Sequence, residues 1–326
     1  MTTSSTQTHT LVVSIINYRT PEMTIDCVKS VLADIGDRDV KVVIVENGSG
    51  DNSVTELQAW IDTQPSGTPV ELVVSGENTG FSGGHNQGIQ AAKAEYYLLF
   101  NSDALLRPGF IDLMLAAAEE HPKHGFVTPR LEHMDGEPQI SSFRFHTPKS
   151  EFLRGANTGQ VTSLMKNAEV AIGVDPDPDE IEWASFACIL LRGAMIDEIG
   201  LMDEGYFLYF EDAEYCLRAR KKGWRIHHEP RAKAVHFRGK SGPVKTLQAQ
   251  KKRLPAYYYA SRTRIFYQSY GWAGLMLANL AWFGGRGIAY LRVLAGKPVP
   301  KAHDAESVDL WINAFQPLGP RRAPGE

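Results

Sequence analysis

The chain has 326 residues, of which 34 are Lys or Arg and 38 are Asp or Glu, so its formal net charge is −4. A hydrophobic content of 43% and a charged content of 22% are those of a globular protein and exclude an intrinsically disordered chain. The three cysteines, Cys27, Cys188 and Cys216, form no CxxC pair, which excludes a disulfide framework and argues against a structural zinc site.

The N-terminal segment MTTSSTQTHT is polar and lacks the basic region and apolar core of a signal peptide. We therefore expect residues 1–10 to form a short loose tail. The use of cysteine fits a reducing, cytoplasmic compartment.

Apolar runs typical of buried strands alternate with helical patterns over residues 11–131. The expected strands are 11–17, 40–47, 70–76, 96–104 and 125–131. The expected helices are 21–33, 53–63, 83–94 and a segment that begins at Pro108. Strands that are apolar throughout and bounded by helices indicate a mostly parallel α/β sheet covered on both faces. Ligands bind such a sheet at the carboxyl ends of its strands.

The second part of the chain begins with residues 132–180, which are turn-rich and predict an irregular excursion or lid. Regular structure is expected again over 181–200, with a helix over 211–222. The tail from about residue 300 has little pattern, and we expect it to wrap the surface.

The charge is distributed unevenly along the chain. Residues 1–217 hold 13 basic and 33 acidic residues, a net charge of −20, whereas residues 218–326 hold 21 basic and 5 acidic residues, a net charge of +16. This asymmetry predicts two surfaces with different partners. Since no nucleic-acid recognition motif accompanies the basic part, we expect it to face lipid headgroups or an acceptor pyrophosphate rather than nucleic acid.

Residues 265–285 carry no charge and are bounded by Arg264 and Arg286. Polar residues and four glycines dilute the hydrophobicity of this segment. Two interpretations fit it: a helix that lies in the headgroup region of a membrane, or a helix that packs on the protein itself. We favour peripheral membrane contact through residues 218–290.

The expected fourth strand ends in Asn101-Ser102-Asp103. A carboxylate at the carboxyl end of a strand is suited to holding a hard divalent cation. The alternative is that Asp103 is only a turn former or a helix cap.

Two further polar loops follow expected strands. Glu46, before Asn47-Gly48, is placed to accept hydrogen bonds from a ribose or base, although a plain Asn-Gly turn also explains the dipeptide. The loop NTGFSGG at 78–84 leads into a helix whose amides can approach a phosphate. It does not match the dinucleotide-binding pattern GxGxxG.

Glu211 and Asp212 stand among aromatic residues at the start of the helix expected over 211–222. Neighbouring helical residues point about 100° apart, so the two acids cannot easily share one role. An acid in aromatic surroundings can act as a general base, and the alternative is that both only stabilise the helix N-terminus. His236, after a short strand, is either a metal ligand or a structural histidine.

Taken together, these segments resemble the family 2 inverting glycosyltransferases, in particular their bacterial rhamnosyltransferase-like branch. The matching segments are SIINYR (14–19), VVIVENGSGDNS (42–53), ENTGFSGGHNQGI (77–89), LLFNSDALLRPGFI (98–111), W-x-S-F-A-x-I-L-L-R (183–192), IGLMDEGYFLYFEDAEYCLRARKKGW (199–224) and HFRGKSG (236–242). The resemblance does not firmly cover residues 132–180 or 245–326.

The resemblance implies an α/β fold of the GT-A type, with a Rossmann-like, mostly parallel sheet flanked by helices and a C-terminal helical extension. The domains that it implies are a catalytic domain over 11–245, divided into a nucleotide-binding half (11–131) and an acceptor-binding half (132–245), and a membrane-proximal or interface extension over 246–326.

The resemblance also implies roles for individual residues. The residues implied to bind the nucleotide-sugar are Asn17, Tyr18, Glu46, Asn78, Phe81, Asn86, Asn101, Ser102 and Asp103. Asp103 and His236 would hold Mg²⁺ or Mn²⁺, and Asp212 would be the catalytic base. The residues implied to contact the acceptor are Trp183, Phe186 and Glu211. The family usually has Asp where this chain has Glu46, and Gly where it has Phe186.

The function implied is transfer of a sugar, plausibly L-rhamnose, from a nucleoside-diphosphate sugar such as dTDP-rhamnose or a UDP-sugar. The acceptor would be a hydroxyl of a polysaccharide or lipid-linked glycan of the cell envelope, at the cytoplasmic face of the membrane. A homo-oligomer is compatible with the sequence. The rival interpretations are a sugar nucleotidyltransferase and a non-catalytic sugar-nucleotide or glycan-binding protein.

Overall fold

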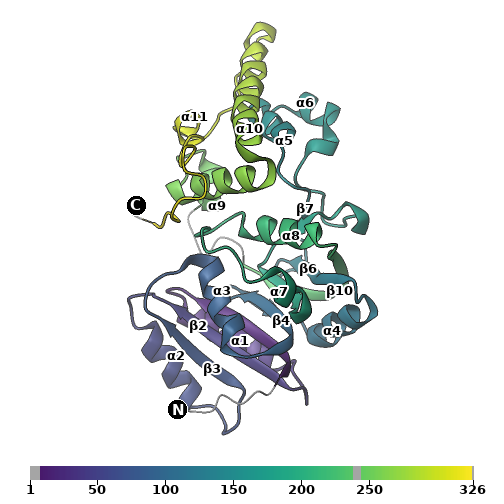
Figure 1. Cartoon of the computed structure of the whole chain (residues 1–326), viewed down its shortest axis with the longest axis vertical. Coiled ribbons are helices and arrows are strands. Elements are labelled where there is room, and N and C mark those ends of the chain that lie inside the picture. The colour runs from purple at the N-terminus through teal and green to yellow at the C-terminus, as the bar shows by residue number, and fades with distance from the viewer. Residues whose placement is uncertain (1–7, 238–243, 325–326) are drawn as a thin grey trace. The chain divides into compact units, whose positions relative to one another are not determined.

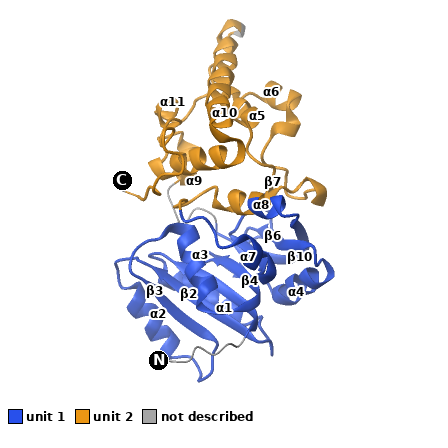
Figure 2. Cartoon of the chain, in the orientation of Figure 1, with its two compact units in different colours: residues 1–141, 184–204, 218–241 blue, residues 142–183, 205–217, 242–326 orange. Residues whose placement is uncertain are grey.

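The computed structural model describes residues 8–237 and 244–324 (Figure 1). The chain divides into two compact units. Unit 1 comprises residues 1–141, 184–204 and 218–241, and unit 2 comprises residues 142–183, 205–217 and 242–326 (Figure 2).

Unit 1 is built on an eight-stranded sheet with the strand order β3-β2-β1-β4-β9-β6-β10-β5. Its strands are β1 (His9–Asn17), β2 (Val40–Asn47), β3 (Val70–Ser75), β4 (Ala94–Asn101), β5 (Ala104–Leu106), β6 (His124–Glu132), β9 (Cys188–Arg192) and β10 (Arg225–His236). β1 pairs in parallel with β2 and β4, β2 with β3, and β6 with β10. The mostly parallel α/β sheet predicted from the sequence is therefore confirmed.

One expectation about an individual strand is wrong. The strand expected over 96–104 ends at Asn101, because Ser102 and Asp103 form a turn and the chain restarts as β5. The strand expected over 125–131 is confirmed as β6. An unpredicted strand, β9, lies between β6 and β4 and is antiparallel to both. β9 comes from a later part of the chain, so no local pattern could have predicted its place in the sheet.

Helices cover both faces of the sheet. The helices of unit 1 are α1 (Pro21–Leu32), α2 (Ser53–Asp62), α3 (Gly80–Ala91), α4 (Phe110–Glu120) and α7 (Gly193–Ile199). α1, α2 and α4 contribute to the same apolar cluster as Leu11, Val13 and Ile15 of β1. Successive strand residues point to opposite faces, so Ser14 points the other way, toward α3. A Cβ at Gly88 of α3 would lie 2.0 Å from Ser14 Oγ, which explains how α3 approaches the sheet so closely.

Unit 2 contains most of the remaining elements. They are β7 (Ser142–Phe143), α5 (Pro148–Ala156), α6 (Gly159–Leu164), α9 (Val244–Gln250), α10 (Ala256–Leu291), α11 (Glu306–Asp309) and the short 3-10 helices η1 (Lys166–Ala168), η2 (Pro178–Glu180) and η3 (Arg292–Ala295). β8 (Trp183–Ala184) and α8 (Glu211–Lys221) each include residues of both units.

The prediction that residues 132–180 are irregular is wrong for α5 and α6. α5 begins at Pro148, and its N-cap is Thr147, whose side chain accepts a hydrogen bond from the backbone N–H of Ser150. The Ser150 hydroxyl in turn accepts from the backbone N–H of Thr147, at 2.9 Å. This reciprocal pair and the proline at the first helical position are both local signals of a helix start.

The long helix α10 bends at Gly271, whose φ of 65° and ψ of −167° are not helical. The second arm, residues 272–291, packs against α5 with unusually close backbones. A Cβ at Gly155 would lie 2.2 Å from the carbonyl oxygen of Trp282, and one at Gly285 would lie 2.1 Å from that of Phe152. One side of the uncharged 265–285 segment thus packs on the protein. Within residues 8–237 and 244–324, no helix is long and apolar enough to cross a bilayer.

A cluster of buried charges links α5 to α10 in the interior of unit 2. Nη2 of the fully buried Arg262 donates to Oε2 of Glu151 at 2.7 Å, and Nη2 of Arg154 donates to the same oxygen at 2.6 Å. Nη1 of Arg262 donates to Oδ1 of Asn279 at 2.7 Å, and Arg154 also pairs with Glu306. Burial alone would raise the pKa of Glu151, but the charges of the two arginines outweigh it and lower this pKa to about 2.

Replacing Glu151 with Gln is expected to destabilise the protein by about 3–5 kcal/mol, because Arg262 would stay buried and charged without its carboxylate. The matched control is Glu180→Gln, which breaks the more exposed ion pair with Arg144 and should cost about 0–1 kcal/mol. Urea unfolding of the full chain at neutral pH measures the free energy of unfolding of both variants. Equal losses of stability would contradict a stabilising role for the buried cluster.

The same cluster predicts how stability depends on pH. The folded-state pKa values of Glu151 and Glu306, each about 2, lie below their ordinary value of 4.5. Their contribution is therefore fully present above about pH 4.5 and is lost as the pH falls toward 2. The melting temperature of the wild type should fall over this range, and that of Glu151→Gln should fall less steeply.

Candidate active site

The polar residues predicted at strand ends meet at one edge of the sheet of unit 1. In the parallel register of β1 with β2, Asn17 lies opposite Glu46, and in that of β1 with β4, Ile16 lies opposite Asn101. The carboxyl ends of these three neighbouring strands therefore place Asn17, Glu46 and Asn101 at the same edge of the sheet, where parallel α/β sheets bind ligands. The side chains of Asn17 and Glu46 share one face, and that of Asn101 points to the other.

Ser49 connects the ends of β1 and β2. Its backbone N–H donates to Oε1 of Glu46 at 2.8 Å, and its hydroxyl accepts from Nδ2 of Asn17 at 3.3 Å and from the backbone N–H of Arg19 at 2.9 Å. Glu46 and Asn17 are buried, so these bonds fix the loop. Tyr18 is 37% exposed, and the Arg19 guanidinium lies 5.1 Å from the centre of its ring.

Sequence reasoning did not single out Ser49 or Arg19. Arg19 has a φ of 60°, in the left-handed region that a residue other than glycine rarely adopts. Strained backbone of this kind clusters at functional sites, but only the folded chain reveals it.

The loop before α3 is fastened to the end of β2 by Asn47. Oδ1 of Asn47 accepts from the backbone N–H and the hydroxyl of Thr79, at 3.0 and 2.8 Å, and its Nδ2 donates to the carbonyl of Gly80 at 3.0 Å. Oδ1 of Asn78 accepts from the Gly80 N–H at 3.0 Å, and the ring of Phe81 packs 4.5 Å from that of His85. The loop that carries Asn78 and Phe81 thus lies beside the end of β2.

His85 of α3 is a buried histidine that sequence reasoning did not single out. Its Nδ1 lies 2.9 Å from the hydroxyl of Ser14, and burial lowers its pKa to about 3. It is therefore a neutral residue of the interior at physiological pH.

Asn86 of α3 holds the loop that precedes residue 205. Its Oδ1 accepts from the Met202 N–H at 3.0 Å, and its Nδ2 donates to the Met202 carbonyl at 3.0 Å and to Oε1 of Glu204 at 2.9 Å. Arg218 holds the same loop, because its Nη1 donates to the carbonyls of Ile199 and Leu201 at 2.7 and 2.9 Å. Asn86 and Arg218 thus both fix the loop of unit 1 that ends at Glu204.

Asp103 and His236 are brought together from distant parts of the chain. Nε2 of His236 lies 3.4 Å from Oδ1 of Asp103, and the two residues are only 8% and 2% exposed. The antiparallel pairing of β5 with β10 creates this contact, since it places His236 opposite Ala104. The Phe237 N–H also donates to the Asp103 carbonyl at 2.9 Å.

These two side chains fit a divalent cation. A carboxylate oxygen suits Mg²⁺ or Mn²⁺, and Nε2 of His236, the ring nitrogen that faces Asp103, offers a nitrogen ligand at the same place. No group of three or more His, Cys, Asp or Glu side chains that could hold a metal occurs among residues 8–237 and 244–324. An ion at this pair would therefore need substrate oxygens and water to complete its shell.

Glu211 and Asp212 begin α8 and belong to unit 2. Glu211 is buried, and its Oε2 has no hydrogen-bond partner among the described residues, whereas Asp212 is half-buried and its Oδ1 accepts from the Ala213 N–H at 2.9 Å. Burial, with the neighbouring charge of Asp212, raises the pKa of Glu211 well above its usual value. The two adjacent acids thus occupy different environments.

The backbone immediately before these acids is strained. Tyr209 and Phe210 have φ values of 73° and 70°, in the left-handed region, and such pairs are costly outside glycine. Phe210 packs 5.0 Å from His146, whose ring also stacks 5.8 Å from that of Trp183. Unit 2 thus places Trp183 in an aromatic cluster beside the residue that precedes Glu211.

Trp183 and Phe186, which the sequence pairs as acceptor-contacting residues, lie in different units. Nε1 of Trp183 donates to the Arg144 carbonyl at 2.9 Å within unit 2. Phe186 is buried in unit 1, 6.0 Å from the ring of Phe126.

Comparisons with known proteins identify the family of the chain. A family model for glycosyl transferase family 2 matches residues 11–173, half of the chain. The chain is 26% identical over 235 residues to the N-acetylglucosaminyl-diphospho-decaprenol L-rhamnosyltransferase of Mycobacterium tuberculosis, covering 66% of this chain and 73% of that protein. It is 25% identical over 230 residues to the low-salt glycan biosynthesis hexosyltransferase Agl10 of Haloferax volcanii, covering 69% of this chain and 66% of Agl10.

Two solved structures are similar to the fold. The mannosyltransferase PcManGT from Pyrobaculum calidifontis, solved with GDP-Man and Mn²⁺, matches with a TM-score of 0.54 and 14% identity over 96% of this chain and 83% of that one. S. aureus TarS matches with a TM-score of 0.52 and 16% identity over 95% of this chain and 80% of that one. The fold is thus of the GT-A type, as predicted. The chain belongs to glycosyl transferase family 2 and is a glycosyltransferase.

Proposed function

We propose that this glycosyltransferase moves L-rhamnose from a nucleoside-diphosphate donor, dTDP-rhamnose, to a hydroxyl of a lipid-linked glycan, with inversion at the anomeric carbon. The observation that carries the proposal is the contact of Asp103 with His236 beside the ends of the parallel strands. The choice of sugar and of a lipid-linked acceptor is supported by the name of the Mycobacterium tuberculosis relative.

The donor would bind at the strand ends of unit 1. Tyr18 offers an exposed ring for the base, while Asn17 and Glu46 hold the loop around it. Asn101 and Ser102 would lie beside the diphosphate, and Asp103 and His236 would hold Mg²⁺ or Mn²⁺. Such an ion, when bound, stabilises the charge that develops on the leaving diphosphate.

Transfer itself would need one general base. Asp212 would accept the proton of the acceptor hydroxyl as its oxygen attacks the anomeric carbon and the bond to the diphosphate breaks. A single displacement inverts the configuration and needs no nucleophile from the protein. Glu211, whose pKa is raised by burial, is held toward its protonated form and would donate a hydrogen bond to the acceptor.

A donor screen tests this proposal. The full chain is incubated with dTDP-rhamnose and a panel of UDP- and GDP-sugars, with Mg²⁺, with Mn²⁺ or with chelator, and the released nucleoside diphosphate is measured. We expect metal-dependent release that is fastest with dTDP-rhamnose. Faster release from another donor would overturn the sugar assignment.

The same screen separates the two rivals. A sugar nucleotidyltransferase would release pyrophosphate from a nucleoside triphosphate in the presence of a sugar phosphate. A binding protein would retain the nucleotide-sugar without releasing any product.

A further inference from the structure

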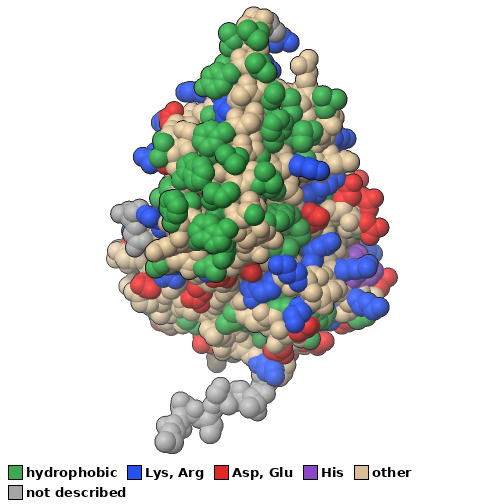
Figure 3. Space-filling view, turned by 45° about the horizontal axis from the view of Figure 1, so that its top comes forward, with side chains coloured by type: hydrophobic (Ala, Val, Ile, Leu, Met, Phe, Trp, Pro, Cys, Tyr) green, Lys and Arg blue, Asp and Glu red, His purple; other side chains and the backbone are tan. Residues whose placement is uncertain are grey.

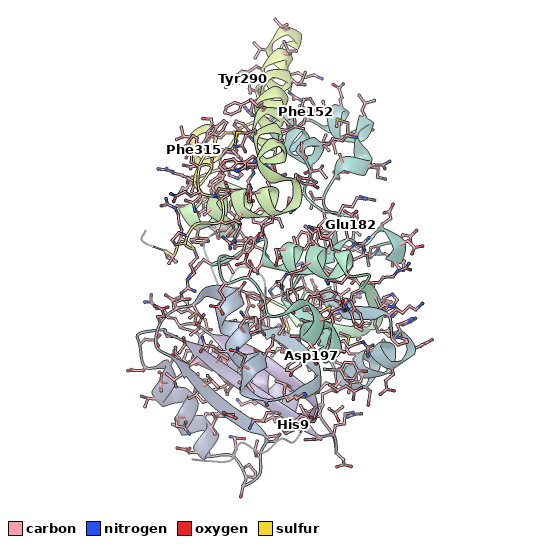
Figure 4. All side chains as sticks on the ribbon, in the orientation of Figure 1. His9, Phe152, Glu182, Asp197, Tyr290 and Phe315 are labelled. Carbon is pink, nitrogen blue, oxygen red and sulfur yellow. The ribbon has the colours of Figure 1, made fainter. Side chains whose placement is uncertain are left out.

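The second arm of α10 has an outer face without a single charged side chain. Between Trp272 and Leu291, the exposed positions are Trp272, Ala273, Leu277, Leu280, Phe283, Gly284, Gly287, Ile288, Tyr290 and Leu291. Leu280, Tyr290 and Leu291 are 60%, 61% and 56% exposed. Figure 4 labels Tyr290 on this arm and Phe152 on the neighbouring α5.

This pattern is the reverse of that of an ordinary surface helix, which turns an apolar stripe inward and charged residues outward. The inner face of the arm is also apolar, since Leu275, Ala278 and Trp282 are buried. A helix that is apolar on both faces is normally buried on both, but here nothing in the described part of unit 2 covers the outer one.

The exposed apolar surface extends beyond the helix. Figure 3 shows many apolar side chains gathered on unit 2. The other strongly exposed apolar residues of its C-terminal part are Val293, Leu294, Val308, Phe315 and Leu318. An apolar surface of this extent marks a site of interaction with a protein or a membrane.

The charges of residues 244–324 indicate whether this apolar surface binds a protein or a membrane. Residues 244–324 contain twelve Lys or Arg and only three acids. Two of these acids are buried in ion pairs, Glu306 with Arg154 and Asp309 with Arg253, so that Asp304 is the one exposed acid of the range 244–324.

Cations lie on and after the arm. Arg286 lies on the arm, but its Nη1 donates to the carbonyls of Gly155 and Pro300. Arg292 follows the arm and is half-buried, and Lys297 and Lys301 are exposed in the next segment. With its exposed apolar side chains, its cations and a single exposed acid, the range 244–324 complements the phosphates and acyl chains of an anionic bilayer. A second copy of the chain would instead bring like charges together across a twofold contact.

We infer that the outer face of residues 272–291 lies in the headgroup region of an anionic lipid surface, with Arg292 and Lys297, which follow it, facing lipid phosphates. The inference goes beyond the proposed chemistry, because it concerns a binding surface that takes no part in it. It would hold unit 2 at the surface that carries a lipid-linked acceptor.

Co-sedimentation of the full chain with vesicles tests this inference without any turnover. We expect binding to vesicles of equimolar phosphatidylcholine and phosphatidylglycerol, and weaker binding to phosphatidylcholine alone. The double variant Leu280→Glu/Leu291→Glu should lose at least about tenfold in partitioning, because two exposed apolar side chains that the lipid would bury are replaced by charges that anionic lipid repels. The matched control is Leu164→Glu, which changes an 86% exposed leucine of α6 and should bind like the wild type.

Brominated lipids provide a second measurement. They should quench the fluorescence of the wild type, and Trp272→Phe should lose part of that quenching. Absence of binding to the anionic vesicles, or equal binding by the wild type and the double variant, would overturn the inference. So would a wild-type dimer, seen by light scattering without lipid, that the double variant cannot form. Release of nucleoside diphosphate is measured separately, so failure here leaves the proposed chemistry untouched.

Discussion

Replacing Asp212 with Asn is expected to lower kcat by about 10²–10⁴-fold, the usual contribution of a general base, while the affinity for the donor stays close to that of the wild type. The amide keeps the size of the carboxylate but cannot take the proton of the acceptor hydroxyl. The loss should therefore fall on kcat rather than on the dissociation constant of the nucleotide, which is measured by calorimetry on the same protein.

Glu211→Gln is the matched control for this substitution. Because burial and the charge of Asp212 raise the pKa of Glu211, its carboxyl is held toward the neutral form, which an amide resembles. We expect Glu211→Gln to lower kcat much less than Asp212→Asn does. The opposite ranking would transfer the role of the base to Glu211, and full activity of both variants would refute a base at this motif.

Replacing Asp103 with Asn is expected to remove most of the metal dependence of donor binding. Removing a residue that only hydrogen-bonds to a metal ligand already lowers metal affinity about 10–100-fold. Removing a ligand itself should therefore lower it at least about tenfold. Calorimetric titration of the nucleoside diphosphate, with and without Mn²⁺, measures this change. Binding without metal should be nearly unaltered.

The double variant Asp103→Asn/His236→Asn tests whether both residues hold the same ion. If they do, the losses of the two single variants will not add, because either substitution alone already removes the shared site. Strictly additive losses of metal-dependent affinity would mean that the two residues do not hold the same ion. Unchanged metal dependence in both single variants would refute the metal site.

The order of elements in the nucleotide-binding half was predictable because it depends on local patterns. β1, β2 and β3 start or end within two residues of the expected positions, since each is an apolar run bounded by turn formers. The helix expected over 83–94 instead runs from Gly80 to Ala91. Its first turn is rich in glycine, which weakens the periodic signal on which such a prediction depends.

The α5 helix was missed for a different reason. Its start has a capping box and a proline, but its apolar residues do not stand out from a polar background. Its partners, Arg262 and the backbone of the second arm of α10, are distant in the chain. Tertiary packing stabilises this helix more than its own sequence does.

The sequence by itself determined the class of fold, the family and the residues at the strand ends, because strand and helix periodicity and turn chemistry are local properties. Only the tertiary structure decided which of these residues meet. The antiparallel pairing of β5 with β10 joins Asp103 to His236, burial distinguishes Glu211 from Asp212, and α5 leaves one face of α10 uncovered. Contacts and burial of this kind depend on residues far apart in the chain, so a local sequence pattern does not predict them.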